Sequence, residues 1–463
     1  MIRELIEAGT DVVRLNFSHG DHTSHARLIR RVRAAARAAG RPVSIIQDLQ
    51  GPRFRIGPLS AEIIDLRTGA RITISARSRA RGNVPGKSNG PDVSGKSSIS
   101  IEPAVDFTGM RAGQAVLIGD EGIELKIASV RGDLLSCRVV RGGRIRSREG
   151  VNFPHAGAVL PSLMSKDIAD LKFGVAQGVD FVALSFVRSA RDMKALRRRL
   201  GDSGIPVIAK IETEEAIRNI AGIIDASDAI MVGRGDLAKE VSMSQIPVLQ
   251  KFLIERCNEK AKPVITATQM LESMMASPEP TRAEATDVAN AVLDGSDALM
   301  LSGETAAGRY PAEAVRMMDS LVRYTERAHD FEWIRQRPAP EPEREIDEMI
   351  AYLAAGAARS LGATAIITFT TSGRTALRVA KFRPSIPIVA VTPSRRTKMM
   401  LVLSYGTVCL EAGKVENTDR MIAGAIAAAK RQGIVRKGDT VAVTAGVPTY
   451  VRGKTNLLKL EVV

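Results

Sequence analysis

Short apolar runs alternate with helical stretches along most of the chain. Before residue 302, seven such runs each end in a polar residue or glycine, and a stretch with the spacing of an amphipathic helix follows. Strands of a parallel sheet are buried on both faces and produce this pattern in a sequence. The seven runs lie at residues 12–15, 43–46, 181–184, 207–211, 229–232, 263–266 and 298–301.

The number of strand–helix units predicts a (β/α)₈ barrel whose first strand is absent. The chain opens directly on a helix, because Ile2, Leu5 and Ile6 follow helical spacing and Gly9 is suited to end it. Two predicted strands also resemble each other, at residues 228–232 and 297–301, and an aspartate begins each segment.

Residues 55–150 have a different pattern. Short runs with alternating apolar and polar positions lie at 71–74, 115–118 and 123–127, and glycines separate them. This pattern predicts a small β-barrel-like domain inserted into the larger barrel, which we call the lid domain. Within it, residues 81–96 are rich in Gly, Ser and Lys and indicate a mobile loop.

A proline-rich linker at residues 336–345 leads to a last α/β segment. Apolar runs alternate with helices there and predict a doubly wound domain with strands at 366–369, 388–391, 440–443 and 457–460. The expected organisation is a (β/α)₈ barrel at 1–54 and 151–335, the lid domain at 55–150, and a C-terminal α/β domain at 346–463.

Length and composition narrow the class of protein. The 463 residues suffice for roughly three domains. No apolar run approaches the ~18 residues of a membrane span, and Arg3, Glu4 and Glu7 stand where a signal peptide has its apolar stretch. Three distant cysteines without zinc-ligand spacing indicate reduced thiols. We therefore expect a cytoplasmic protein that does not bind a membrane.

The net charge of +15 leaves two interpretations open, nucleic-acid binding or an enzyme with anionic substrates. Aromatic residues make up only 4%, so surfaces for stacking bases are scarce. Basic residues at 27–41 and 188–199 interleave with Ala and Leu, as on exposed helix faces. These observations favour the enzyme and argue against a nucleic-acid partner.

Polar residues gather where the predicted strands end, the place where barrel enzymes carry their catalytic groups. Lys210 and Glu212 are two residues apart on one strand, so their side chains point to the same face. At the next strand end, residues 233–236 offer backbone N–H groups to an anion and the Asp236 carboxylate to a metal. Two carboxylates with few other ligands suit Mg²⁺, although a plain salt bridge between Lys210 and Glu212 is the simpler alternative.

The other strand ends add hydroxyls and further charges. These residues are Arg14, Asn16 and Ser18, then Asp48, then Arg53 and Arg55 leading into the lid domain, and finally Thr268 and Ser302. Arginines for a phosphate beside carboxylates for a cation suit phosphoryl transfer. His19, His22 and His25 could suggest a metal site, but no further ligand supports it, so we favour a surface or rim position. Residues 281–284 fit a helix capping box.

Six stretches together resemble the pyruvate kinase family, over essentially the whole chain. They lie at residues 14–20, 209–212, 234–237, 265–273, 280–284 and 300–306, the first reading Arg-Leu-Asn-Phe-Ser-His-Gly and the last Met-Leu-Ser-Gly-Glu-Thr-Ala. The set is specific because all six occur in the same order as in the family. The resemblance implies phosphoryl transfer from phosphoenolpyruvate to ADP, which gives pyruvate and ATP in the last step of glycolysis.

The resemblance also implies roles for individual residues. Glu212 and Asp236 resemble the ligands of Mg²⁺ or Mn²⁺. Lys210 resembles the lysine that neutralises the transferred phosphoryl group, and Arg14 resembles a second group that holds it.

Further roles concern the substrate carboxylate and the proton. The backbone N–H groups of Gly235 and Asp236, with the Thr268 hydroxyl, resemble a cradle for that carboxylate. Thr268 and Ser302 resemble members of the relay that protonates the enolate, which we expect to work through water.

A third group of residues resembles the nucleotide site, namely Arg55, Asn16, His19 and Asp120. Asp120 resembles the lid carboxylate that meets the nucleotide's metal when the lid domain closes and excludes water. Three residues that flank Asp236 depart from the family's usual Ala-Arg-Gly-Asp-Leu-Gly-Val without replacing the metal ligand, namely Gly233, Ala238 and Lys239.

Asn16, Ser18 and Asp48 match the positions of a monovalent-cation site. Members of the family that need K⁺ carry Thr-Lys after the aspartate and a Glu three residues further on. Here Leu-Gln follows Asp48, and Arg53 takes the position of the Glu. This resembles the K⁺-independent branch, in which a basic side chain replaces the ion, so we expect that K⁺ is not required.

In the last domain, a segment rich in hydroxyls follows a predicted strand and precedes a helix. Hydroxyls, a glycine and helix N–H groups suit a phosphate, and the segment resembles the family's allosteric site for a phosphorylated effector. A capped helix start is the alternative. The segment consists of Thr370, Thr371, Ser372, Gly373, Arg374 and Thr375. The resemblance further implies a homotetramer.

The missing first strand motivates another hypothesis, a catalytically impaired, truncated paralogue that only binds phosphometabolites. The intact chemistry at the strand ends argues against it. The family has one more strand before Ile2, with a sequence like Lys-Ile-Val-Ala-Thr-Ile-Gly-Pro, so we expect the start of the protein to lie further upstream.

Overall fold

The computed structural model describes residues 1–59, 61–76, 97–119, 122–154, 160–327, 345–411, 417–447 and 455–463. The chain folds into two compact units: Gln50–Met164 forms one, and Met1–Leu49 with Ser165–Val463 forms the other. The predicted loop at 81–96, Asp120 and all but the last residue of the predicted linker lie outside the described residues.

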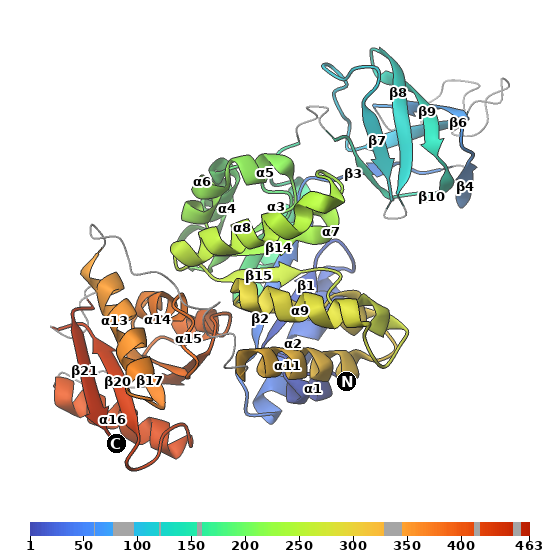
Figure 1. The fold of residues 1–463 in the computed structure, drawn as a ribbon. Helices are drawn as coiled ribbons and strands as arrows, with labels where there is room; N and C mark the ends of the chain where they lie inside the picture. Colours follow the sequence, from blue (N-terminus) through green and yellow to red (C-terminus); the bar gives the residue numbers. More distant parts are fainter. Residues whose placement is uncertain are drawn as a thin grey trace. The chain divides into compact units, whose positions relative to one another are not determined.

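Seven parallel strands form the main sheet of the larger unit (Figure 1). They are β1 (Val12–Asn16), β2 (Ser44–Leu49), β12 (Phe181–Leu184), β13 (Val207–Ile211), β14 (Ala229–Gly233), β15 (Val264–Ala267) and β16 (Ala298–Met300). Their order in the sheet follows the chain, with β1 and β16 at the two edges. All seven predicted strands are confirmed, and within the described residues the sheet has no eighth strand between its edges.

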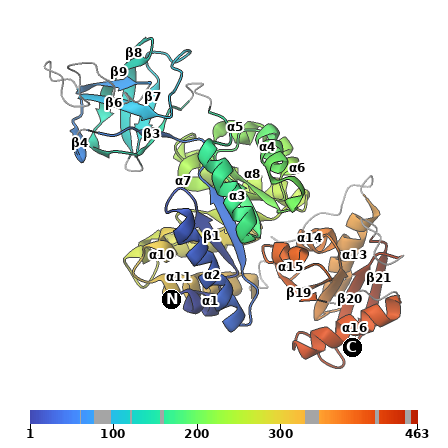
Figure 2. The ribbon, with the colours of Figure 1, turned by 180° about the vertical axis from the view of Figure 1, so that it is seen from behind.

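Helices follow the strands and cover the outside of the sheet (Figures 1 and 2). They are α1 (Ile2–Ala8), α2 (His22–Ala38), α3 (Ser165–Gln177), α4 (Ala190–Leu200), α5 (Glu214–Arg218), α6 (Ile220–Ala226), α7 (Arg234–Leu237), α8 (Ile246–Glu259), α9 (Arg282–Asp294), α10 (Gly303–Ala306) and α11 (Pro311–Arg327), with short 3₁₀ helices at Gly201–Ser203, Met243–Gln245 and Glu272–Met275. The first helix packs against α11, so the layer of helices closes where the sheet does not.

Two predicted helix ends are confirmed. Gly9 ends α1 with a φ of 131°, a conformation that favours glycine. Thr281 begins α9 in a capping box, in which its hydroxyl accepts the Glu284 N–H at 3.2 Å and the Glu284 carboxylate accepts the Thr281 N–H at 2.8 Å.

The interior of the barrel is apolar. Its buried cluster includes Ile46, Phe181, Ile208, Met231 and Ile265, which come from five different strands. Because side chains alternate along a strand, these residues fill the inside while their neighbours face the helices. The polar residues that follow the strands therefore lie together at one end of the barrel, which we call the rim, next to the apolar interior.

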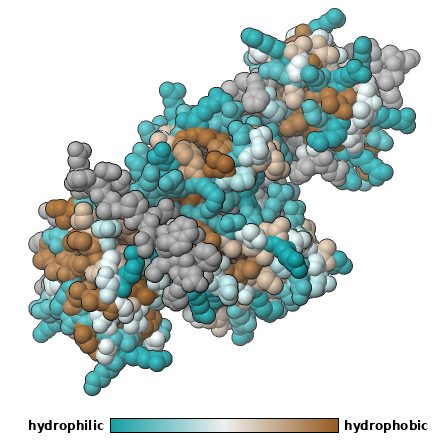
Figure 3. Space-filling view, in the orientation of Figure 1, coloured by the Kyte–Doolittle hydropathy of each residue, from teal (hydrophilic) through white to brown (hydrophobic). Residues whose placement is uncertain are grey.

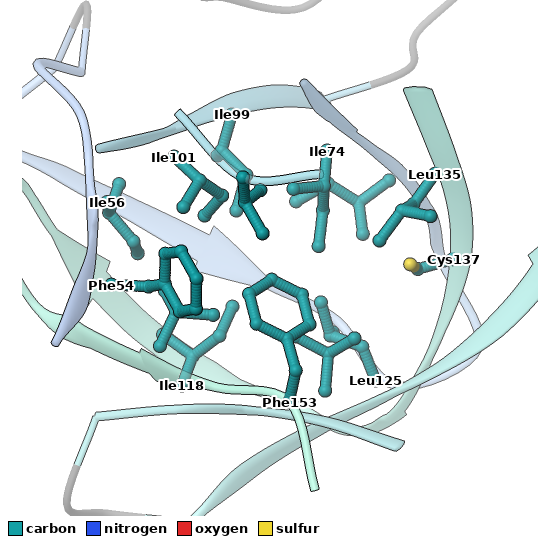
Figure 4. Close-up of a cluster of buried hydrophobic side chains, with 14 of the residues drawn as sticks. Phe54, Ile56, Ile74, Ile99, Ile101, Ile118, Leu125, Leu135, Cys137 and Phe153 are labelled. Carbon is teal, nitrogen blue, oxygen red and sulfur yellow. The ribbon is translucent and has the colours of Figure 1, made fainter. Parts of the chain in front are cut away.

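The smaller unit is a closed antiparallel and parallel β-barrel, with strand order β11-β3-β6-β5-β9-β8-β7 and a separate ribbon of β10 and β4. Its strands are β3 (Phe54–Ile56), β4 (Ile63–Leu66), β5 (Arg71–Ser75), β6 (Ser97–Glu102), β7 (Ala115–Ile118), β8 (Ile123–Arg131), β9 (Leu134–Arg141), β10 (Gly143–Arg146) and β11 (Gly150–Asn152). Figure 4 shows its core, where Phe54 meets Phe153 edge to face at 5.4 Å between ring centroids. The inserted β-barrel-like fold is thus confirmed.

The C-terminal segment forms a five-stranded sheet in the order β19-β18-β17-β20-β21. Its elements are α13 (Ile346–Ser360), β17 (Ala365–Phe369), α14 (Arg374–Ala380), β18 (Ile388–Thr392), α15 (Arg395–Leu401), β19 (Thr407–Glu411), α16 (Thr418–Arg431), β20 (Thr440–Ala445) and β21 (Leu457–Val462). Only β21 is antiparallel to its neighbour. Separate apolar clusters cover the two faces, one with α13 and α14 and the other with α16, which confirms the doubly wound fold.

Residues at the end of α15 and directly after it join the C-terminal segment to the barrel. Leu403 is buried within the barrel's apolar cluster, and Met400 packs against that cluster. Ser44, at the start of β2, donates a hydrogen bond from its hydroxyl to the Met399 carbonyl at 2.7 Å. Nowhere in the described part of the chain is a helix long and apolar enough to span a membrane.

Candidate active site

Four charged side chains meet at the carboxyl end of the main sheet. Lys210 of β13 places its Nζ atom 2.9 Å from Glu212 Oε1 and 3.3 Å from Asp48 Oδ2. Arg14 of β1 reaches the same Asp48 oxygen with Nη2 at 2.6 Å. The register sets this meeting, because Asn16 of β1 lies beside Asp48 of β2. The structure therefore brings together residues that the sequence places at three separate strand ends.

These groups are charged although they are buried. Lys210 and Asp48 are 8% and 1% exposed. Burial acts to lower the pKa of Lys210, but the carboxylates of Asp48 and Glu212 outweigh it and raise that pKa. Burial acts to raise the pKa of Asp48, but Lys210 and Arg14 outweigh it and lower that pKa. The site thus holds a fixed ammonium and a fixed carboxylate in apolar surroundings.

Glu212 differs because its pKa is raised. Burial is the main cause, and the charge of Asp236 adds to it while Lys210 opposes it. The ionised Glu212 carboxylate is therefore short of positive charge. A divalent cation held by Glu212 and Asp236 would supply that charge, and Mg²⁺ prefers carboxylate oxygens together with water and substrate oxygens. Within the described ranges no group of three or more His, Cys, Asp or Glu could hold a metal, so this pair would depend on substrate and water for its other ligands.

The three predicted members of the carboxylate cradle lie side by side. The Gly235 N–H donates to Thr268 Oγ1 at 2.9 Å, so in this structure the N–H and the hydroxyl bind each other. Asp236, the next residue, accepts a hydrogen bond from Lys239 Nζ at 2.9 Å. A substrate carboxylate at this place would have to replace the Gly235–Thr268 hydrogen bond.

Thr268 begins a loop with an unusual backbone. Thr268 and Gln269 have φ angles of 70° and 54°, which are rare for residues other than glycine and costly for a β-branched one. Arg234 compensates by donating to the carbonyls of Thr268 at 2.6 Å and of Ala267 and Gln269 at 3.3 Å. Its other nitrogen, Nη1, pairs with Asp287 at 2.7 Å. The buried guanidinium thereby fixes the Thr268 hydroxyl at the rim.

Ser302 lies just beyond the end of β16. Its hydroxyl oxygen is buried and has no hydrogen-bond partner within the part of the chain that the structure describes. Its backbone N–H donates to Glu304 Oε2 at 2.7 Å. The hydroxyl is therefore free to bind a substrate or a water molecule.

Ser185 and Phe186 belong to the site but were not among the predicted residues. Lys210 Nζ donates to Ser185 Oγ at 2.8 Å, and that hydroxyl donates onward to the Leu49 carbonyl at 2.8 Å. The Phe186 N–H, at a φ of 54°, donates to Glu212 Oε2 at 2.9 Å. A polar residue directly after the predicted strand at 181–184 was the signal for Ser185. No signal exists for Phe186, because a backbone N–H acts there.

Two of the three positions of the predicted monovalent-cation site, Asn16 and Asp48, have side chains with other partners. Asn16 Oδ1 accepts the Ser18 N–H at 3.0 Å. Asp48 Oδ2 is shared by Arg14 and Lys210. The carboxylate already faces two cations of the chain itself.

The histidines after β1 do not gather around one point. His22 Nε2 lies 2.8 Å from Asp170 Oδ1, and His25 Nε2 lies 2.9 Å from the His19 carbonyl. The His25 ring stacks on Phe17 at 3.9 Å between centroids. His19 and His22 are exposed, as predicted for a surface or rim position, but His25 is buried at 6% exposed, so the prediction is wrong for His25.

Arg55 lies in the smaller unit, on β3. Its Nη1 donates to the Arg148 carbonyl at 2.9 Å. Burial, with the charges of Arg53 and Arg148, lowers the pKa of Arg55. Three guanidinium groups near one another suit an anion. Asp120, the other predicted nucleotide contact in this unit, lies outside the described residues.

The predicted effector segment forms the turn before α14. Thr370 Oγ1 accepts the Gly373 N–H at 2.8 Å, and Gly373 has a φ of 89°. The Thr371 carbonyl accepts the Thr397 hydroxyl at 2.8 Å. Arg374 lies 3.5 Å from Glu345, and the Thr375 hydroxyl lies 2.7 Å from that of Thr455. Ser372 is exposed.

The chain matches two family models, described as pyruvate kinase, barrel domain, over residues 1–315 and pyruvate kinase, alpha/beta domain, over residues 348–461. A pyruvate kinase of Geobacillus stearothermophilus is 43% identical over 99% of this chain and 77% of its own length. One of Clostridium acetobutylicum is 39% identical over 100% of this chain and 96% of its own. The crystal structure of a pyruvate kinase from Cryptosporidium parvum superimposes with a TM-score of 0.88 at 35% identity, covering 100% of this chain and 92% of that one.

Proposed function

The chain belongs to the pyruvate kinase family, and from that premise we propose that it transfers the phosphoryl group of phosphoenolpyruvate to ADP and releases pyruvate and ATP. The observation that carries the proposal is the buried Lys210, held charged between Asp48 and Glu212 at the carboxyl end of the sheet. Phosphoryl transfer needs fixed positive charge where the anionic transition state forms, in a place with little water. We further propose that the enzyme works in the cytoplasm.

Lys210 and Arg14 would hold the phosphoryl group. Their positive groups both contact Asp48, so they lie within a few ångströms of one oxygen and converge on one side of the rim. Ser185 fixes the direction of the ammonium, because its hydroxyl accepts from Nζ. Such a fixed cation pair does not have to reorganise when charge spreads over the phosphoryl oxygens.

Glu212 and Asp236 would hold Mg²⁺ or Mn²⁺. The raised pKa of Glu212, caused by burial and by the charge of Asp236, supports a cation at this pair. When bound, the metal ion would neutralise substrate oxygens and orient them. Glu212 meanwhile keeps its other contacts, with Lys210 and with the Phe186 N–H.

Thr268 and Ser302 would deliver the proton that turns the enolate into pyruvate. The Thr268 hydroxyl is fixed by Gly235, and the Ser302 hydroxyl is buried without a partner among the described residues. Gly235 and Asp236 N–H groups would hold the substrate carboxylate beside them. A relay of hydroxyls through water suits both positions.

The residues proposed for the nucleotide are those that the family resemblance implies. We propose Asn16 and His19 from the barrel, with Arg55 and Asp120 from the lid domain. The anion-attracting surroundings of Arg55 support its part in binding phosphate.

We propose that K⁺ is not required. Asp48 already receives Arg14 and Lys210, so its charge is compensated within the chain. Turnover should be the same in KCl and in tetramethylammonium chloride at equal ionic strength. An activation of several fold by KCl would contradict this proposal.

The test of the main function is a pyruvate-release assay with phosphoenolpyruvate, ADP and Mg²⁺. Lys210→Met should lower turnover by at least about 10²-fold, because it removes the central cation from the site. Lys262→Met is the matched control, since Lys262 donates to the Ser227 carbonyl before β14 at 2.5 Å, far along the barrel from the rim. Absence of turnover in the unsubstituted chain would contradict the proposed activity.

The alternative of an impaired protein that only binds phosphometabolites gives a different result in the same experiment. Such a protein would bind phosphoenolpyruvate in calorimetry and release no pyruvate. Binding with turnover excludes it.

We propose that the turn from Thr370 to Thr375 binds a phosphorylated effector. Exposed Ser372 and the N–H groups at the start of α14 support this, while the hydrogen bond from Gly373 to Thr370 is what a simple turn would also have. Ser372→Asp should abolish activation by sugar phosphates and leave basal turnover unchanged.

We propose a homotetramer. An exposed apolar face on the C-terminal segment supports self-association, and Figure 3 shows apolar side chains gathered there. It includes Ile346, Met349 and Leu353 of α13 and Leu460 and Val462 of the edge strand β21. Light scattering should give four chains, and Val462→Lys should reduce that number.

A further inference from the structure

Glu304 is a buried carboxylate that joins two loops at the rim of the barrel. It is 3% exposed. Its Oε2 accepts the Ser302 N–H at 2.7 Å, and its Oε1 accepts the Leu271 N–H at 3.2 Å. The first N–H belongs to the loop after β16, and the second belongs to the loop after β15. One side chain thus bridges neighbouring strand ends 33 residues apart in the chain.

The two loops carry the two hydroxyls proposed for proton delivery. Leu271 closes the loop that Thr268 opens, a loop whose left-handed residues need external support. Arg234 supports it through the carbonyls at its start. Glu304 supports its other end and, at the same time, the backbone of Ser302. The distance between the two hydroxyls therefore depends on Glu304.

The bonding of Glu304 leaves little freedom. Within the described residues, no Lys, Arg or His pairs with it, and its hydrogen bonds go to two backbone N–H groups. Burying a carboxylate without hydrogen-bond donors costs free energy. The Glu304 carboxylate therefore stays bonded to both N–H groups and holds them in place. Substitution of the carboxylate would leave at least one buried N–H without an acceptor.

We propose that Glu304 is a positioning residue for protonation of the enolate, an inference that rests on the proposed function. In that step a C–H bond forms at the methylene carbon of the enolate, the carbonyl of pyruvate forms, and the hydroxyl and water relay gives up one proton and regains it from solvent. Glu304 does not touch the substrate. It fixes the separation of the Thr268 and Ser302 hydroxyls, so the relay meets the enolate carbon.

The experiment compares Glu304→Gln and Glu304→Ala with Asp180→Asn. Asp180 is the comparison because this half-buried carboxylate, which pairs with Arg33, also accepts a strand N–H, that of Ile45 at 2.8 Å, but at the opposite end of the barrel. Three quantities are measured: the KM and kcat with phosphoenolpyruvate, the exchange of pyruvate methyl protons with D₂O in the presence of Mg²⁺ and ATP, and amide hydrogen exchange of the segments around Leu271 and Ser302.

We expect Glu304→Gln to lower methyl-proton exchange and kcat about tenfold while KM changes less than about twofold. Glu304→Ala should have a larger effect. In both variants the amides of Leu271 and Ser302 should exchange faster together, whether or not the chain turns over. Asp180→Asn should lower stability and leave the ratio of methyl exchange to turnover as it is.

Two results would overturn the inference. One is an active Glu304→Gln variant with wild-type methyl exchange, since Glu304 would then serve stability alone. The other is unchanged amide protection at Leu271 and Ser302 in Glu304→Ala, which would show that the bridge does not fix the loops. The unsubstituted chain could have no turnover while Glu304→Ala speeds amide exchange at both Leu271 and Ser302. In that case the bridging role of Glu304 is supported and the proposed function is contradicted.

Discussion

Both ends of the barrel carry carboxylates, but the partners of these carboxylates differ between the two ends. At the amino end, Asp180, Asp228 and Asp297 precede strands, and each accepts the N–H of a residue at the start of the neighbouring strand at 2.8 to 3.0 Å. Each also pairs with one arginine: Arg33, Arg197 and Arg383, respectively. Every carboxylate there has a matching cation and a backbone donor, which makes these groups parts of the framework.

At the carboxyl end the matching is incomplete. Asp48 has two cations, Glu212 shares Lys210 with Asp48 and has a pKa raised mainly by burial, and the Ser302 hydroxyl has no partner within the described chain. This is the end at which we propose that the substrate and a metal ion bind. The substrate would bring phosphate oxygens, and the metal ion would bring positive charge. Folding stability and chemistry are thus assigned to opposite ends, and the ion pairs tell them apart: each carboxylate discussed at the amino end has its own arginine, whereas Asp48 and Glu212 share Lys210.

The largest effect on activity should come from Glu212→Gln. We expect turnover to fall at least about 10³-fold, since the change removes a carboxylate that we propose to hold the metal ion. Stability should change by less than about 1 kcal/mol, because burial and Asp236 already disfavour the charge that is removed. Turnover and thermal melting of the same preparation measure both. A variant that keeps its activity, or one that loses several kcal/mol of stability, would contradict the division between the two ends.

The reverse pattern is expected for Asp297→Asn. Arg383 and Asp297 are 3% and 5% exposed, so the substitution leaves a buried guanidinium without its counter-charge. This should cost about 3 kcal/mol in the free energy of unfolding. Because Arg383 comes from the C-terminal segment, we also expect that segment to unfold separately from the barrel. A calorimetric scan should show two unfolding transitions. An assay at a temperature at which the variant is folded should give turnover within about threefold of wild type.

The sequence predicted the framework better than the rim. The strands of the main sheet are continuous apolar runs, so their pattern sufficed. The aspartates at 228 and 297 showed a repetition in the sequence, but Arg383 lies 86 residues from Asp297 in the chain, and only the fold brings it there. Strand β19 was missed because its residues are mostly half-buried or exposed.

At the rim, most side chains were predictable from the sequence, whereas the backbone groups that depend on positive φ angles were not. Lys210, Glu212 and Asp48 lie at strand ends, and their charged side chains could be recognised from the sequence as candidates for the site. The donor from Phe186 and the left-handed turn at Thr268 depend on positive φ angles, which neither residue type suggests. Glu304 was visible only as part of a motif, since its task is to accept backbone N–H groups from two loops.

A smaller loss of stability should follow Asp180→Asn. Arg33 and Asp180 are 21% and 13% exposed, so water can replace part of what their ion pair provides. We expect a loss of about 1 kcal/mol, clearly below that for Asp297→Asn, with unchanged turnover. Chemical denaturation of both variants side by side measures the difference. Equal losses would mean that burial does not rank the ion pairs at the amino end.

The smallest effect concerns Gly233, the glycine beside the proposed metal ligands. A Cβ atom at Gly233 would lie 2.7 Å from Glu212 Cγ, so Gly233→Ala would push the Glu212 side chain out of its present position. We expect the Mg²⁺ concentration for half-maximal turnover to rise about threefold, which corresponds to roughly 0.7 kcal/mol. Melting temperature should hardly change, since Gly233 has a φ of –89° that alanine adopts readily. A shift in melting temperature without a change in Mg²⁺ dependence would place Gly233 with the framework rather than with the chemistry.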